Sequence, residues 1–213
     1  MSGACDWFAA LEANNNKAWF EQNRAVWEDG IRDPLTALLN DAAAARGGSV
    51  KVFRLNRDVR FSKDKSPYKL STSGYISPDE GAAALYVSLS KDGLYVGCGY
   101  YDMTRDQLAR FRAAVAGSAG AGLAAEVASL RRDGVEVHGR SLKTAPRGFA
   151  KDHQRIELLR MKEMIAGARL DRDQSEAGGA SAHANQIWDR TASWCDWLDT
   201  HVGPSEALPE AFP

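Results

Sequence analysis

The chain has 213 residues, of which 44% are hydrophobic and 26% are charged, and its formal net charge is −1 at pH 7. This composition is typical of a soluble globular protein, and the length suffices for one sizeable core or at most two small domains. A pI near 6.4 argues against a nucleic-acid binder held by bulk charge. No apolar run reaches the roughly 18 residues that span a bilayer, so we expect no membrane association.

The cysteines and the first residues bear on the compartment. Cys5, Cys98 and Cys195 are odd in number and far apart in the sequence, which favours reduced thiols over a disulfide framework. The first residues lack the basic and apolar regions of a signal peptide, so we expect none. Together these features predict a cytoplasmic protein.

The first quarter of the chain predicts three helices. Apolar residues recur at helical spacing over 7–11 and 17–31, and three consecutive asparagines separate these segments as a turn. Pro34 suits the first turn of a third helix over 34–46, which Gly47 ends.

Residues 53–61 alternate between apolar and polar side chains, which predicts a strand. Phe53, Leu55, Val59 and Phe61 fall on the core-facing parity of that strand. Arg57 shares this parity, although its side chain is charged. A polar loop is expected to follow.

A β-hairpin is the clearest local structure in the sequence. Two alternating apolar runs, 85–90 and 94–100, flank an Asp92-Gly93 turn. Gly97 and Gly99 share one face of the second strand, which predicts a close approach by another group to that face.

The remaining predicted strands are short, at 74–76 and 135–137. The remaining predicted helices are one that begins at Thr104, one through Leu123 and Leu130, one from Gln154 to Ile165, and a final one that carries Ile187 and Leu198. A Gly/Ser-rich surface loop is predicted over 171–184. The sequence has no internal repeat and no convincing linker. We therefore predict α+β class: a single domain over residues 1–213, with a central mostly antiparallel sheet and helices packed mainly on one face.

Residues 51–69 form the densest basic segment of the chain. This segment holds seven Lys or Arg and two Asp, a local balance of +5. On a strand, residues two apart point to the same side about 6.6 Å from each other, so one row would contain Arg54, Asn56, Asp58 and Arg60. Such a row suits a planar or tetrahedral anion, because arginine binds carboxylate and phosphate bidentately. Alternatively, Asp58 accepts hydrogen bonds from both arginines and the row satisfies itself.

Arg57 requires a partner, because an unpaired buried charge is costly. That partner is either a ligand or an internal carboxylate, and the sequence leaves both alternatives open.

The segment Arg54–Lys69 resembles the signature of the DUF2461 family, and residues 11–24, 93–100 and 145–153 are similar to other blocks of the family. The resemblance extends from about Trp7 to about Trp197. It implies a single α+β domain of a mostly bacterial family of unknown function, and so implies no activity. The signature residues in this sequence are Arg54, Arg57, Asp58, Arg60, Phe61, Asp64, Lys65 and Tyr68.

The sequence contains no convincing catalytic motif. Two Ser-x-x-Lys spacings, at 62–65 and 66–69, match those of serine acyl-enzymes, but the companion motifs of those enzymes are absent. The four histidines are scattered and form no metal-binding spacing. We assign no catalytic residue, no metal ligand and no cofactor.

The leading hypothesis is therefore a domain that binds a small anionic ligand, bearing phosphate or carboxylate, through the basic strand and loop. The candidate ligand-binding residues are Arg54, Asn56, Arg57, Asp58, Arg60, Lys63, Asp64, Lys65, Tyr68, Lys69 and Arg147. One alternative is a hydrolase or transferase acting on a phosphorylated substrate in the same pocket. Others are a nucleic-acid or protein interaction module and a self-satisfied ionic network that fixes the sheet. The acidic remainder of the chain argues against nucleic acid, and the oligomeric state stays open.

Overall fold

The computed structural model describes residues 3–79 and 81–206. These residues form two compact units. The first unit contains 3–79, 85–96 and 169–187, and the second contains 81–84, 97–168 and 188–206. The prediction of one domain over the whole chain stays a prediction.

Six strands form one sheet in the order β1-β2-β3-β4-β6-β5. Their bounds are β1 Ser49–Val52, β2 Ser71–Ser77, β3 Ala84–Ser90, β4 Gly93–Tyr100, β5 Glu136–His138 and β6 Met164–Leu170. The pairs β1–β2, β2–β3 and β5–β6 are antiparallel. With the helices described next, this sheet confirms the predicted α+β class.

The longer α-helices are α1 Ala4–Ala13, α2 Lys17–Trp27, α3 Asp33–Arg46, α4 Arg105–Ala116, α5 Ala119–Arg132, α8 Ala180–Arg190 and α9 Ala192–His201. Shorter helical segments are η1 Glu28–Arg32, α6 Ile156–Arg160, α7 Arg172–Gln174 and η2 Ser175–Gly179, of which η1 and η2 are π-helical. No single helix within 3–79 or 81–206 is long and apolar enough to cross a bilayer, and α4 and α5 meet that test of length and composition only as a pair bent by 90°.

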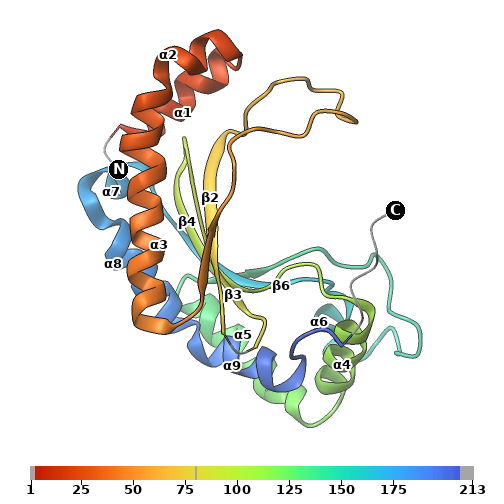
Figure 1. The fold of residues 1–213 in the computed structure, drawn as a ribbon. Coiled ribbons are helices and arrows are strands. Elements are labelled where there is room, and N and C mark those ends of the chain that lie inside the picture. Colours follow the sequence, from red (N-terminus) through yellow and green to blue (C-terminus); the bar gives the residue numbers. More distant parts are fainter. Residues whose placement is uncertain (1–2, 80, 207–213) are drawn as a thin grey trace. The chain divides into compact units, whose positions relative to one another are not determined.

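The first three helices match the prediction, and their ends explain why. The side chain of Asn16 accepts a hydrogen bond from the backbone N–H of Trp19 at 3.0 Å and so caps α2. Pro34 lies in the first turn of α3, and Gly47 ends this helix with a φ of 81°. Helix α3 packs against β1 and β2 (Figure 1).

The predicted strand over 53–61 is wrong. Strand β1 ends at Val52, and residues 53–70 form a loop that projects beyond the end of β2 (Figure 1). The loop folds back on itself, because the backbone N–H of Arg57 donates to Pro67 O and that of Lys69 donates to Leu55 O, both at 2.8 Å. Leu55 is buried as predicted, but the side chain of Phe61 is 96% exposed.

The hairpin prediction holds, and the close approach at its glycines has an internal cause. A Cβ added to Gly99, whose φ is +129°, would lie 2.0 Å from the carbonyl oxygen of Met164 in β6. The carbonyl oxygen of Gly97 accepts a hydrogen bond from the indole of Trp188 at 3.2 Å. The neighbouring strand and a tryptophan, rather than a ligand, thus lie against these glycines.

Two predictions in the last third of the chain are wrong. The expected helix from Gln154 to Ile165 is instead the short α6 followed by β6, and the expected loop over 171–184 contains α7, η2 and the start of α8. The apolar run of β6 is short, and a short apolar run does not distinguish a buried strand from a buried helix segment. By contrast, β5 matches the strand predicted at 135–137 within one residue at each end.

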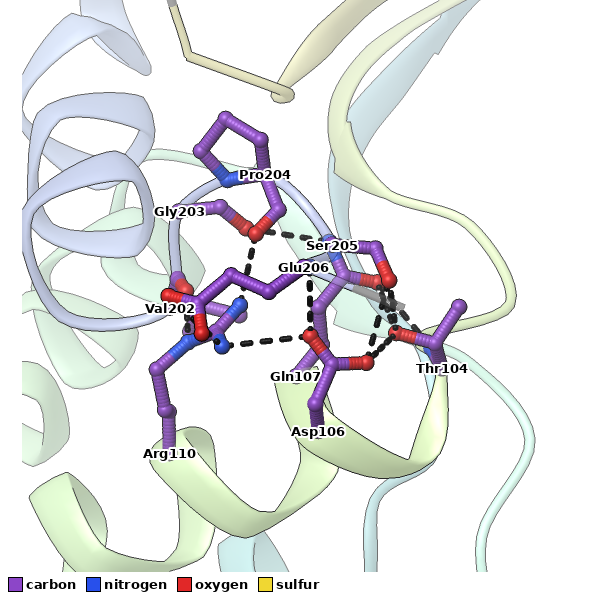
Figure 2. Close-up of polar contacts among 9 residues, drawn as sticks. All are labelled: Thr104, Asp106, Gln107, Arg110, Val202, Gly203, Pro204, Ser205 and Glu206. Carbon is purple, nitrogen blue, oxygen red and sulfur yellow. Dashed lines mark hydrogen bonds and ion pairs between the residues drawn. The ribbon is translucent and has the colours of Figure 1, made fainter. Parts of the chain in front are cut away.

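The segment 202–206, which follows α9 in the second unit, is fixed to α4 (Figure 2). The guanidinium of Arg110 donates to the carbonyl oxygen of Val202 at 2.5 Å. The carboxylate of Asp106, one turn earlier on α4, accepts from the backbone N–H of Glu206 at 2.9 Å. These bonds satisfy carbonyl and N–H groups that lie beyond the last helix.

Candidate functional site

A hollow of about 460 Å³ opens in the first unit at the end of α1 and the base of the 53–70 loop. Its walls carry four ionic side chains, those of Glu12, Arg57, Asp64 and Lys69. The other lining residues are Asn15, Ser66, Tyr68 and Leu70. The hollow therefore lies on the segment that the sequence singles out as basic.

Arg57 is held by an internal carboxylate. Its Nη1 donates to the carboxylate of Asp64 and, at 3.2 Å, to the carbonyl oxygen of Ser66. Only 26% of the Arg57 side chain is exposed, whereas 60% of the Asp64 side chain is exposed. Of the two partners that the sequence left open for Arg57, the structure thus shows the internal carboxylate.

Asp64 is the centre of a small hydrogen-bonded turn. Its Oδ1 accepts from the backbone N–H of Ser66 at 2.9 Å and also from the Ser66 hydroxyl. The Ser66 hydroxyl, the Ser66 N–H and then Arg57 lower the pKa of Asp64 to about 2. Asp64 is therefore an ionised acceptor at neutral pH.

The turn after α1 fixes the far end of the loop. The side-chain amide of Asn15 donates to Tyr68 O at 3.0 Å and accepts from the Tyr68 N–H at 3.1 Å. The Tyr68 ring lies against Phe20 with 4.2 Å between centroids, and Tyr68 is buried. Tyr68 thus anchors the hollow to the core, and its predicted contact with a ligand stays a prediction.

Two lysines of the 53–70 loop, Lys65 and Lys69, hold it together. Lys65 Nζ donates to Val59 O at 3.0 Å, and Lys69 Nζ donates to Arg54 O at 3.0 Å. Lys69 also lies over the ring of Phe53, at 5.5 Å from its centroid. Lys69 lines the hollow, and Lys65 is not among the lining residues.

The predicted row of alternating polar side chains does not form, because residues 54–60 are not a strand. Asp58 instead pairs with Arg60, which donates through Nη2 at 2.7 Å on the exposed part of the loop. This bond from Arg60 lowers the pKa of Asp58 to about 2.

The structure brings only part of the predicted site together. Arg57, Asp64, Tyr68 and Lys69 line the hollow. Six other predicted residues lie on the same loop but are not among its lining residues: Arg54, Asn56, Asp58, Arg60, Lys63 and Lys65. Arg147 lies exposed in the second unit, between β5 and α6, and its part in the site stays a prediction.

Sequence reasoning missed Glu12, Asn15, Ser66 and Leu70 as lining residues. The signal for the first two was the N-terminal block over 11–24, which carries the three asparagines. The sequence predicts a turn there and a resemblance to a block of the family, but nothing local to the block indicates that the segment near residue 68 binds there.

A pair of cysteines in the second unit was also not predicted. The side chains of Cys98 on β4 and Cys195 on α9 form a hydrogen bond, although they are 97 residues apart in the sequence. This bond and burial raise the pKa of Cys195, so its thiol stays protonated and is a poor nucleophile. Within 3–79 and 81–206, no group of three or more His, Cys, Asp or Glu residues is arranged to hold a metal ion.

Comparison with known proteins gives a family for the chain. None of the curated proteins compared with it is a match. Residues 3–197 match a family described as a conserved hypothetical protein, DUF2461. This match includes all eight residues that line the hollow. The chain therefore belongs to the DUF2461 family.

Proposed function

We propose that the protein binds a small anionic ligand, bearing a carboxylate or a phosphate, in the hollow beside the 53–70 loop. The observation that supports this function is the arrangement of Arg57, a half-buried guanidinium whose carboxylate partner Asp64 is the more exposed of the two. Asp64 occupies the position on Arg57 that a ligand carboxylate or phosphate would take. Because 60% of the Asp64 side chain is exposed, water can solvate its Oδ2 when a ligand anion takes its place on Arg57.

Lys69 would complete the anion site. Its ammonium group is tied to the carbonyl oxygen of Arg54, which fixes its position at the wall. An ammonium group has three donors and only one is used in this bond, so Lys69 keeps donors for a ligand oxygen. We place this binding protein in the cytoplasm of a bacterium, as its three free cysteines and its family resemblance suggest.

A thermal-shift screen tests this function. The purified chain is heated with carboxylates, phosphates, sugar phosphates and nucleotides, beside Arg57→Ala and the control Arg54→Ala. Arg54 is an exposed arginine of the same loop that does not line the hollow, so its truncation removes the same charge without touching the site. A ligand at 100 times its Kd stabilises the fold by about 2.7 kcal/mol and so raises the melting temperature.

The stabilisation by a ligand of this site should disappear in Arg57→Ala and survive in Arg54→Ala. Lys69→Met keeps the apolar stem over Phe53. This variant should bind the same ligand more weakly without unfolding the protein. A screen without any stabilising compound, together with an unfolded Arg57→Ala, would contradict the proposal. It would favour instead the structural role that the Arg57–Asp64–Ser66 bonds already support.

A further inference from the structure

The charges around the hollow cancel. Arg57 and Lys69 contribute two positive charges to its walls, and Glu12 and Asp64 contribute two negative charges. A ligand with negative charge alone would gain from the first pair and would be repelled by any carboxylate left without a cation. The two carboxylates of the lining therefore indicate that the ligand carries a positive group as well as a negative one.

The two carboxylates differ in what already binds them. Asp64 accepts hydrogen bonds from Arg57 and from two groups of Ser66, so both of its oxygens are in use. Glu12, in the last turn of α1, pairs through Oε2 with Lys91 at 2.6 Å. This pair is open to solvent, with side-chain exposures of 44% for Glu12 and 43% for Lys91.

Lys91 does not belong to the lining residues, so its ammonium group reaches Glu12 from outside the hollow. Since an exposed lysine–glutamate pair is weak, a cation inside the hollow can take the place of Lys91 at small cost. Glu12 is thus the acceptor that the hollow offers to a positive group, as Arg57 is the donor that it offers to a negative group.

We propose that the ligand is a small zwitterion, whose carboxylate or phosphate binds Arg57 and Lys69 and whose protonated amine binds Glu12. This inference rests on the proposed function and names the class of ligand for the same hollow. On binding, the anion of the ligand replaces Asp64 on Arg57, and the amine replaces Lys91 on Glu12. Asp64 keeps the two hydrogen bonds from Ser66, and Lys91 turns to water. A hollow of about 460 Å³ is within the range of roughly 300–1,000 Å³ that is usual for small-molecule sites.

Matched pairs of compounds test the amine directly. Isothermal titration calorimetry compares β-alanine with propionate and 2-aminoethyl phosphate with ethyl phosphate, so each pair differs by one ammonium group. The ammonium group adds one partly exposed ion pair with Glu12, so the zwitterion should bind about two- to fivefold more tightly than its amine-free partner.

Two variants assign the preference to a residue. Glu12→Gln should weaken binding of the zwitterion and strengthen binding of the amine-free anion. The two compounds should then bind about equally tightly. Lys91→Gln breaks the same exposed pair but keeps the Glu12 carboxylate, so the preference should stay or rise. The melting temperature of each variant without ligand shows that its fold is intact.

The outcomes separate this inference from the function on which it rests. Amine-free anions that bind the unaltered protein as tightly as the zwitterions would overturn the zwitterion and leave the anion site in place. A preference that Glu12→Gln does not change would also overturn it, since the amine would then bind elsewhere. If no member of either pair and no compound of the thermal-shift screen binds, the proposed function fails and this inference fails with it.

Discussion

Asp64 is the residue whose hydrogen bonds give the clearest prediction of pH-dependent stability. Its pKa is lowered from 3.8 to about 2, chiefly because the Ser66 hydroxyl and N–H donate to its carboxylate. A carboxylate with a lowered pKa stabilises the folded state above its unfolded pKa. This contribution is lost as the pH falls from about 4 through about 2.

Asp64→Asn should therefore lower the melting temperature at pH 6, and the gap to the unaltered protein should narrow by pH 2. Circular dichroism melts across this range measure the gap. Ser66→Ala serves as a companion, because removal of its hydroxyl should raise the pKa of Asp64, read by carbon-13 NMR. A gap of constant size between pH 6 and pH 2 would show that the ionised form of Asp64 does not stabilise the loop.

At the scale of elements, strand β4 depends on a glycine where β6 approaches. A Cβ at Gly99 would meet the carbonyl oxygen of Met164 at 2.0 Å, and the φ of +129° disfavours any other residue. Gly99→Ala should destabilise the fold by more than about 1 kcal/mol in urea unfolding. Gly122→Ala in α5 is the control, since no atom lies within 4 Å of its added Cβ and alanine favours a helix. Equal stability of the two variants would contradict this packing.

The elements also show how far the sequence could predict the fold. The β3–β4 hairpin and the starts of α2, α3 and α4 carry local signals, namely Asp92-Gly93, Asn16, Pro34 and Thr104. The loop over 53–70 carries the local pattern of a strand, but bonds between its own two arms decide its structure. Alternation of side chains reports that a segment would fit a half-buried strand, and the contacts between the two arms of this loop override it.

In the candidate site, too, local signals could be predicted from the sequence and contacts between distant segments could not. Arg57, Asp64, Tyr68 and Lys69 could be predicted, because they lie within one dense segment whose chemistry is visible in the sequence. Glu12 could not, because it reaches the hollow only through the bonds of Asn15 to Tyr68, 53 residues away. Long-range contacts of this kind leave no periodic signal.

At the scale of the whole molecule, charge is unevenly distributed along the chain. Residues 51–69 carry +5 and the chain carries −1, so the remaining residues carry −6. An acidic remainder repels a polyanion but has less effect on a small ligand whose ammonium group offsets part of its negative charge. The distribution thus favours a small molecule over nucleic acid as the occupant of the hollow, in agreement with the balanced charges of its walls.

An NMR titration of the full chain with 2-aminoethyl phosphate shows whether a ligand binds in the hollow beside the 53–70 loop. Amide chemical shifts report where a ligand binds without any prior choice of variant. Saturable shifts should be concentrated at the residues that line the hollow, namely Glu12, Asn15, Arg57, Asp64, Ser66 and 68–70. Saturable shifts confined to other parts of the chain, or no shifts at all, would contradict the claim that this hollow is the binding site.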